Sequence, residues 1–151
     1  MKLQISTRLA IFAALELTAR ENSQLSVADI GEKYGVSSHH LAKVMHVMGR
    51  AGLVRAVRGA GGGYRFAGNP RRTTLLDVVQ LFEDINPIEK ETEAADATPE
   101  GRALRAILNE IDAIAEATLG SITIATMHKL LNHGGGSRGR SKPGRRAGSH
   151  L

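Results

Sequence analysis

Hydrophobic and polar positions in the first third of the chain follow the three-to-four-residue period of amphipathic α-helices. This pattern predicts three helices, over residues 5–20, 27–34 and 38–51. Ser26 and Ser37 stand directly before the second and third helices, where a hydroxyl can cap free backbone amides. The chain therefore begins with three short helices joined by polar loops.

The turn between the second and third helices has the spacing of a helix-turn-helix. Where two helices cross at a tight turn, the contact needs a small residue, the turn needs a glycine, and the flanking positions must be apolar. Gly31 is the small residue and Gly35 the turn glycine. The apolar positions are filled by Ile30, Tyr34, Val36, Leu41 and Val44. A recognition helix follows from this pattern, although a purely structural helical hairpin has the same one.

Two short strands are predicted next, over residues 53–57 and 64–67, joined by the segment RGAGGG. A proline and two arginines end this unit. The predicted fold class is therefore mainly α, with a winged helix-turn-helix domain over residues 1–72 whose wing is a two-stranded hairpin.

The glycine-rich segment could instead be a phosphate-binding loop. A Walker-type loop needs a lysine and a hydroxyl residue after its last glycine, and neither follows Gly63. A dinucleotide fingerprint needs a glycine where Tyr64 stands. A hairpin tip remains, in which glycines adopt positive φ angles. There Arg58 can enter a minor groove, while Arg55 and Arg65 can reach phosphates.

The pattern changes after residue 72. Thr74 and Asp77 have the spacing of a capping box before a fourth helix over residues 75–85. Residues 88–97 are acidic and lack apolar periodicity, so we expect a loop. Residues 73–97 are therefore predicted to link the first domain to the C-terminal part of the chain.

A long helix is predicted from residue 99 to about residue 119, with Gly120 as its cap. Its 21 residues span about 31 Å, more than a compact core of this size needs. One face carries Leu104, Ile107, Leu108, Ile111 and Ile114. It could be a core helix, but the length favours a dimerisation arm within residues 98–132, where residues 121–131 add a short final helix.

The remaining residues, 133–151, are rich in glycine, serine and arginine and are predicted to be a disordered basic tail. Such a tail either adds sequence-independent attraction to phosphates or is only a solubilising end. The chain holds no cysteine, which excludes disulfides, thiol catalysis and cysteine-ligated metal sites. No apolar run approaches the roughly 20 residues of a membrane span. We expect a cytoplasmic protein without a membrane partner.

Charge is distributed unevenly along the chain. Residues 1–72 carry a net charge of +7, residues 73–132 a net of −7, and residues 133–151 a net of +5. A basic first domain followed by an acidic region is typical of a polyanion-binding module with an appended part that does not touch the polyanion. Double-stranded DNA is the expected partner.

The outward residues near the start of the third helix are the candidates for reading bases: Ser38, His39, His40, Ala42 and Lys43, with His46 further along. A metal site among these histidines is disfavoured, since adjacent helical residues diverge and His39 and His40 have no partner at the i+4 position. The sequence shows no nucleophile–base pair, so we do not expect an enzyme.

The run SSHHLAKVMHVMGRAGLVRAVRGAGGGYRFA resembles the signature of the Rrf2 family of bacterial winged-helix transcription regulators. The start MKL and the segment RLAIFAAL also match, and the resemblance extends over residues 1 to about 132. It implies a homodimer held by the long helix, which binds a palindromic operator through two recognition helices and two wings. We expect a repressor.

By position, the resemblance places His39, His40 and Lys43 on base-reading or phosphate-contacting sites and Arg58 on the minor-groove arginine. Ala42 stands where some members carry a base-reading acid, so their operator sequence does not transfer. The full set of predicted DNA-binding residues is Ser38, His39, His40, Lys43, Arg55, Arg58, Gly59, Tyr64 and Arg65.

Many members of this family hold an iron–sulfur cluster through three cysteines in the loop before the dimer helix. This chain has none there, so no cofactor is predicted, and its effector is unknown. Two interpretations are open: a natural cysteine-free member, or an engineered replacement at Ala94, Ala95 and Ala97. A rival hypothesis is a winged-helix interaction module that regulates a protein partner through the acidic residues 83–100 without binding DNA.

Overall fold

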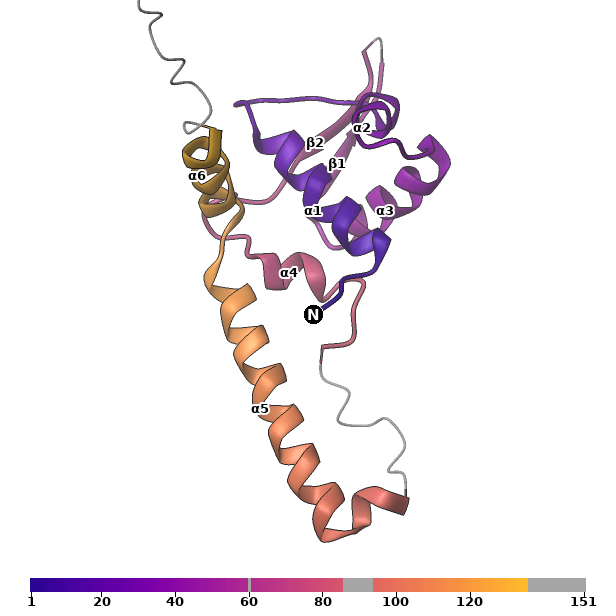
Figure 1. The fold of residues 1–151 in the computed structure, drawn as a ribbon. Helices are drawn as coiled ribbons and strands as arrows, with labels where there is room; N and C mark the ends of the chain where they lie inside the picture. Colours follow the sequence, from indigo (N-terminus) through magenta and orange to yellow (C-terminus); the bar gives the residue numbers. More distant parts are fainter. Residues whose placement is uncertain (60, 86–93, 136–151) are drawn as a thin grey trace, which may run out of the picture.

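A computed structural model describes residues 1–59, 61–85 and 94–135. Within these residues the fold is mainly α, with a two-stranded antiparallel sheet, as the sequence predicts (Figure 1). No helix in this part of the chain is both long and apolar enough to cross a membrane. The elements are α1 (Ile5–Thr18), α2 (Val27–Tyr34), α3 (Ser38–Arg50), β1 (Val54–Val57), β2 (Gly63–Phe66), α4 (Leu75–Val79), the 3-10 helix η1 (Ala94–Ala97), α5 (Pro99–Ser121) and α6 (Ile124–Gly134).

Helix α1 lies at the centre of the molecule and contacts α3, α4, α6 and β2. As predicted, it is amphipathic: Ile5 and Arg8 are exposed and Phe12 and Glu16 are only half-buried along one narrow stripe, whereas most of the remaining helix surface is made of buried residues. Three of them are alanines with no exposed surface, which let the neighbouring helices approach closely. The buried positions are Thr7, Leu9, Ala10, Ile11, Ala13, Ala14, Leu15 and Leu17.

The helix-turn-helix forms through local contacts that confirm the predicted caps. Ser26 and Asp29 exchange hydrogen bonds of 3.0 Å as a capping box at the start of α2. The Ser37 hydroxyl accepts from the backbone amide of residue 40, at 3.2 Å, at the start of α3. Gly35 has a φ of 66°, a left-handed conformation that favours glycine. At Gly31 a Cβ would lie 2.6 Å from the Val36 carbonyl oxygen, so only glycine fits between the helices.

A polar cluster joins the end of α2 to α1. Glu16 Oε1 accepts hydrogen bonds from Lys33 Nζ at 2.5 Å and from the Tyr34 hydroxyl at 2.6 Å. The Tyr34 ring stacks on Phe12 with centroids 4.7 Å apart. Burial by itself would raise the pKa of Glu16, but the two hydrogen bonds and the Lys33 charge outweigh it and lower that pKa. Burial and the hydrogen bond to Glu16 raise the pKa of Tyr34.

Strands β1 and β2 pair antiparallel, with Val54 opposite Phe66 and Val57 opposite Gly63. The loop before α2 adds a third segment to this sheet through two hydrogen bonds between the main chains of Leu25 and Tyr64, of 3.1 and 2.7 Å. Gly63 is required there, because a Cβ would lie 2.5 Å from the Leu25 carbonyl oxygen. The wing is thus attached to the helix-turn-helix at its base.

Helices α4 and α6 begin side by side. Their N-caps, Thr74 and Thr123, pair as an antiparallel bridge, with Leu75 N donating to the Ile122 oxygen at 2.8 Å. Ile124 N donates to the Thr73 oxygen at 2.9 Å, and the Ile124 side chain is fully buried. This junction holds the C-terminal half of the chain against the first domain.

Two boundaries between residues 75 and 97 differ from the sequence prediction. Helix α4 ends at Val79 rather than at residue 85, because the chain tightens there into i→i+3 turns. The Glu83 side chain turns to the start of α1, where it accepts hydrogen bonds from Gln4 N and the Thr7 hydroxyl, both 2.7 Å long. Residues 94–97 are helical, held by an Asp96–Arg105 ion pair, and not loop as predicted. The rest of the predicted loop, residues 88–93, lies outside the described residues.

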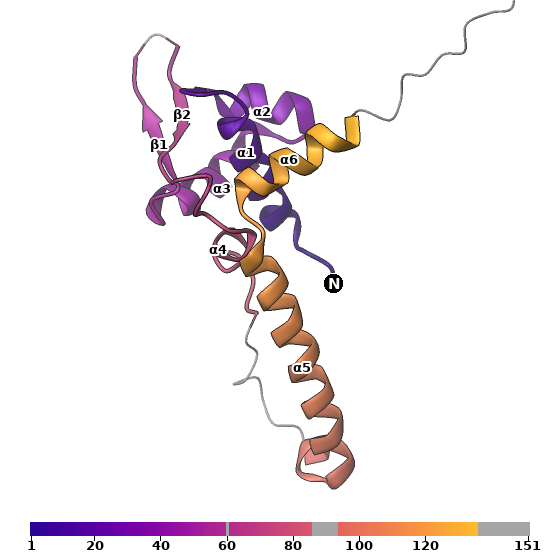
Figure 2. The ribbon, with the colours of Figure 1, turned by 90° about the vertical axis from the view of Figure 1, so that its left-hand side faces the viewer.

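Helix α5 continues through Gly120, whose predicted capping role is wrong: a Cβ there would lie 3.3 Å from Leu76 Cδ2, so the glycine lets α5 pass close to α4. The helix extends away from the rest of the molecule (Figures 1 and 2). Helix α6 begins at Ile124 rather than at residue 121 and reaches Gly134, which takes in the start of the predicted tail. The rest of that tail, residues 136–151, lies outside the described residues.

Gly31→Ala should destabilise the fold by about 1–3 kcal/mol, because the added methyl group overpacks the crossing of α2 and the following turn. The matched control is Gly49→Ala on α3, where the nearest atom to the new Cβ is 3.8 Å away. We expect this control to stabilise by about 0.5–1 kcal/mol, because alanine is the better helix former. Urea denaturation measures both, and equal stability of the two variants would contradict the close contact.

Glu16→Gln should lower the free energy of unfolding at neutral pH and flatten its dependence on acid pH. A carboxyl group whose pKa is lowered by folding stabilises fully above its unfolded pKa and loses this contribution as the pH falls through the folded value. The difference between wild type and variant should therefore shrink below about pH 4.5. Denaturation at pH 7 and pH 3 measures it, with the exposed residue Glu21→Gln as control. A constant difference at both pH values would refute the role of the Glu16 charge.

Candidate nucleic-acid interface

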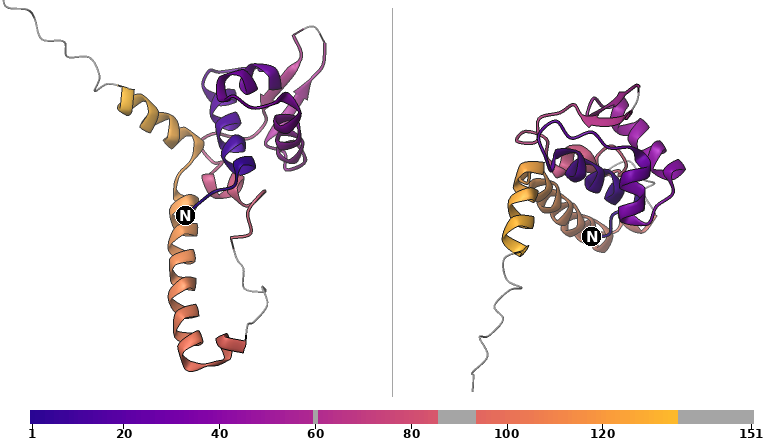
Figure 3. Two further views of the ribbon diagram at one scale, coloured as in Figure 1. Left: turned by 45° about the vertical axis from the view of Figure 1, so that its right-hand side comes forward. Right: turned by 90° about the horizontal axis from the view of Figure 1, so that it is seen from above.

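Helix α3 and the wing lie together on the side of the first domain away from α6 (Figures 1, 2 and 3). They are adjacent in the fold, since α3 contacts β1. The two predicted DNA-binding segments, residues 38–50 and 55–66, are thus brought to one face by packing on α1. This arrangement allows a groove-reading helix and a hairpin to contact one duplex at the same time.

The orientation of α3 follows from its apolar residues. Leu41, Val44, Met45 and Met48 are buried in the core, so the opposite face of the helix is outward. Of the predicted residues, Ser38, His39 and Lys43 are exposed on that outward face, as is His46. Side chains at the exposed N-terminal end of such a helix have the position from which base edges are read in a major groove.

His40 differs from its neighbours on α3. It is half-buried, and its Nε2 atom lies 3.4 Å from the Ser6 hydroxyl at the start of α1. One ring nitrogen therefore faces the protein. His40 is placed to set the position of α3 relative to α1, and contact with DNA remains a prediction for it.

The wing presents two arginines at its base and one at its tip. Arg55 and Arg65 are directly opposite each other in the strand register. Like charges at such positions destabilise a hairpin unless an anion or another partner lies between them. Arg58 and Gly59 are exposed at the tip, where Gly59 has a φ of 109°. The pairing of Arg55 with Arg65 therefore carries a local electrostatic cost.

Gln24 supports the wing, and the sequence analysis missed it. Its Nε2 atom donates to the Gly61 carbonyl oxygen, while its Oε1 atom accepts from Arg65 Nε at 3.2 Å. The residue thus ties the glycine-rich tip and one arginine to the loop before α2. No sequence signal reveals this contact, because Gln24 lies 37 and 41 residues from its partners.

Tyr64 has its backbone bonded to Leu25 on one side of β2, and its half-buried side chain packs against the core. The structure places it as a support of the wing. Among the predicted residues it is the one whose surroundings are most apolar, and its contact with DNA also remains a prediction.

Charge makes this face suited to a polyanion. Residues 35–66, which include α3 and the wing, contain five lysines and arginines and no aspartate or glutamate. Of the predicted cations, Lys43, Arg55 and Arg58 are exposed. A surface of this kind attracts nucleic acid at long range through release of counterions from the phosphates.

The family model Rrf2, described as "Iron-dependent Transcriptional regulator", matches residues 3–129. An iron–sulfur cluster held by thiolates does not fit this chain, since it has no cysteine. In the described residues, no group of three or more histidines and carboxylates could hold a metal ion either. The residues that could ligate a metal in place of cysteines are Glu89, Glu91, Glu93 and His128. His128 Nε2 is hydrogen-bonded to the Thr18 hydroxyl, and the three glutamates lie outside the described residues.

Named relatives agree with the family model. The chain is 48% identical over 132 residues to the HTH-type transcriptional regulator BadM of Rhodopseudomonas palustris, covering 87% of this chain and 84% of BadM. It is 34% identical over 109 residues to the transcriptional regulator NsrR of Shouchella clausii, covering 70% of each. These relatives are regulators, which confirms that the chain is not an enzyme.

Solved structures show the same fold. IscR of T. potens superposes with a TM-score of 0.74 at 25% identity, covering 92% of this chain and 94% of IscR. CymR, the global cysteine regulator of B. subtilis, gives a TM-score of 0.72 at 25% identity, covering 86% and 98%. With the helix-turn-helix, the wing and the basic face in place, these matches show that the chain belongs to the Rrf2 family of winged-helix, DNA-binding transcriptional regulators.

Proposed function

We propose that this regulator binds a palindromic operator as a homodimer and represses transcription from it. The observation that carries the proposal is the combination of a basic reading face at one end of the molecule with an uncovered apolar row on α5. Neither feature is needed for the stability of the single chain, and each fits one part of the proposed function.

The apolar row on α5 consists of large side chains that are each at least half exposed: Leu104 (58%), Ile107 (59%), Leu108 (51%), Ile111 (55%) and Ile114 (60%). Their spacing places them on one face of the helix. A contiguous exposed apolar surface of this kind marks an interface. A second copy covers it with the same row, because two-fold symmetry is the commonest way to pair identical chains.

Two-fold symmetry has a consequence for the DNA. It presents two copies of α3 and two wings, so that the operator repeats as inverted half-sites about one helical turn, roughly 34–36 Å, apart. In the proposed complex Lys43 contacts a guanine or a phosphate, Arg55 and Arg65 contact phosphates, and Arg58 enters the narrow minor groove. Repression needs only occupancy of a promoter, for which a reading face and a dimer arm suffice.

Arg58→Ala and Lys43→Ala should each weaken operator binding by about 1–3 kcal/mol, roughly 5- to 150-fold. Loss of a phosphate contact should also make the dependence of affinity on salt less steep. The operator is obtained first by selecting bound fragments from genomic DNA, and each variant is then titrated against it. Lys129→Ala, an exposed cation on α6, is the control and should leave affinity unchanged.

Unchanged affinity in both variants would overturn the assigned reading face. The absence of an enriched palindrome among the bound fragments would favour the interaction-module hypothesis instead. A reporter gene placed behind the operator tests repression: expression should rise when the regulator is deleted, and a fall would indicate an activator.

Ile111→Glu should convert the dimer to a monomer, because it places a charge at the centre of the apolar row on α5. Operator affinity should fall with it, since two half-sites are then no longer bound together. Ala113→Glu is the matched control, because residue 113 is exposed about 180° around the helix from the row. Light scattering coupled to size-exclusion chromatography measures the mass. A monomeric wild type at micromolar concentration would contradict the proposal.

A further inference from the structure

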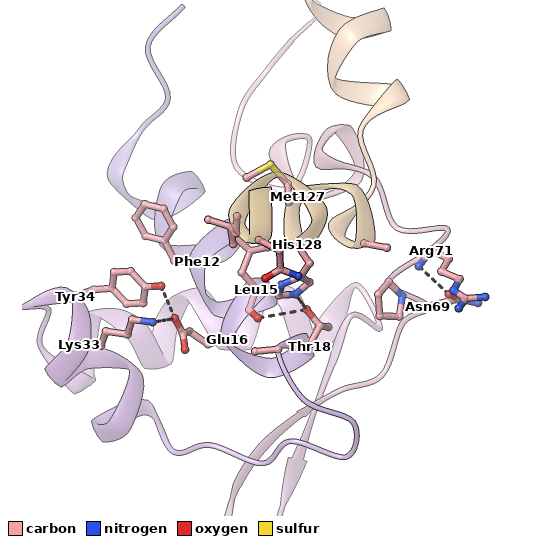
Figure 4. A pocket seen from close by; sticks show the side chains of 15 residues that line it. Phe12, Leu15, Glu16, Thr18, Lys33, Tyr34, Asn69, Arg71, Met127 and His128 are labelled. Carbon is pink, nitrogen blue, oxygen red and sulfur yellow. Dashed lines mark hydrogen bonds and ion pairs between the residues drawn. The ribbon is translucent and has the colours of Figure 1, made fainter. Parts of the chain in front are cut away.

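A cavity of about 750 Å³ lies between α1, α2, α6 and the segment of residues 69–71 (Figure 4). Its size is in the range of sites that take small molecules. It is on the other side of α1 from the α3 packing contacts, so it is separate from the predicted DNA-binding residues. None of those nine residues lines it.

One wall of the cavity is apolar. Phe12 and Leu15 line it from α1, and Met127 and Leu131 line it from α6. Leu131 is 56% exposed at its margin, a large apolar surface that the chain leaves uncovered. A ligand with a hydrocarbon body would remove this surface from water at a gain of roughly 25 cal/mol per Å².

The second wall is polar and already ordered. Among the described residues, Glu16 is the one carboxylate that lines the cavity; its charge is matched by Lys33, and it also accepts a hydrogen bond from the Tyr34 hydroxyl. Phe12 stacks on the Tyr34 ring, and Lys33 Nζ lies 5.6 Å from the centre of that ring. Because the Glu16 carboxylate is already paired within the protein, the cavity offers little negative charge to attract a cationic ligand.

One ring nitrogen of His128, Nε2, is hydrogen-bonded to Thr18, and the other, Nδ1, is not. The Thr18 hydroxyl has a single proton, which it donates to the Ala14 carbonyl oxygen at 2.6 Å. The 2.8 Å contact between Thr18 Oγ1 and His128 Nε2 therefore has the imidazole as donor. His128 Nδ1 is then the ring nitrogen that is left to interact with a ligand in the cavity.

A further cation stands at the other end of the cavity. Arg71 follows Pro70 in a turn that is held by a 2.9 Å hydrogen bond from Arg71 N to the Asn69 side chain. Its guanidinium group forms no ion pair within the described part of the chain. Among the described residues that line the cavity, the cation without an ion-pair partner is therefore Arg71, which favours an anion.

The geometry points to this cavity as a regulatory site for a small amphipathic anion, a molecule with an apolar body and one carboxylate or similar group. The apolar body lies against α1 and α6, and the anionic group lies toward Arg71. A ligand there contacts α6 and the last turn of α2, next to the Gly35 turn that sets the angle between α2 and α3. Regulation of operator binding by this ligand rests on the proposed function, whereas binding itself does not.

Octanoate is a suitable probe, and its counterparts of matched chain length are octylammonium, which is positively charged, and 1-octanol, which is neutral. We expect octanoate to shift the amide resonances of pocket residues on α1 and α6 saturably, in spectra of the full wild-type chain. Octylammonium and octanol should bind at least tenfold more weakly. Equal affinity for the three probes would show that Arg71 does not select the ligand and would overturn the proposal. Changes of amide resonances confined to α5 would overturn it as well.

Two variants locate the site. Arg71→Gln should weaken octanoate binding at least fivefold, and Ala125→Leu should abolish it by filling the cavity from α6. Leu130→Ala is the matched control, since Leu130 is an exposed leucine on the same helix that does not line the cavity. Octanoate affinity unchanged in both cavity variants would overturn the site.

Two further measurements test the site: octanoate binding by the monomeric variant, and operator affinity in the presence of octanoate. Octanoate that binds the Ile111→Glu monomer but not the wild-type dimer would mean that a second copy covers the cavity, and would overturn the proposal. With the wild type, saturating octanoate should change the operator dissociation constant at least threefold. Saturable binding without this change would overturn the regulatory part. Loss of operator binding without octanoate contradicts only the proposed function, because the spectra report binding independently.

Discussion

The packing around α1 is the interaction on which the rest of the structure depends. Helices α3, α4 and α6 and strand β2 all contact this one helix, and its alanines bring them close enough to exclude water. The reading face therefore has a rigid support, because α3 and β2 both rest on the same buried rod. The C-terminal half of the chain rests on it too, through α4 and α6. A substitution inside α1 would therefore disturb the packing of α3, α4, α6 and β2 together.

The parts of the fold that the sequence predicts well are those decided by neighbouring residues. The capping hydroxyls of Ser26, Ser37 and Thr74 act on amides three residues away, and the Gly35 turn needs only its own backbone angle. The parts that it missed depend on residues far apart. Glu83, which follows α4, accepts hydrogen bonds at the start of α1, nearly eighty residues earlier in the chain. Gly120 does not cap α5 but lets it pass close to α4.

The candidate site follows the same division. The outward face of α3 and the exposed arginines of the wing could be predicted, since helical periodicity and strand register are local properties. The different surroundings of His40 and Tyr64 could not, because Ser6 and Leu25 approach them only in the folded chain. The wing also carries a local electrostatic cost. Arg55 and Arg65 face each other across the hairpin, and the Gln24 contact offsets part of their repulsion through tertiary structure.

The junction at Thr74 and Thr123 acts as the pivot of a lever. Two backbone hydrogen bonds and the buried Ile124 side chain fix the direction in which α5 leaves the first domain. The helix beyond this pivot has 23 residues, a length of about 35 Å at 1.5 Å per residue. A rotation of about 10° at the pivot therefore displaces the far end of α5 by about 6 Å, roughly the height of one helical turn. Any change of angle at this junction would thus be amplified along α5 and would alter the distance between the far end of α5 and the wing.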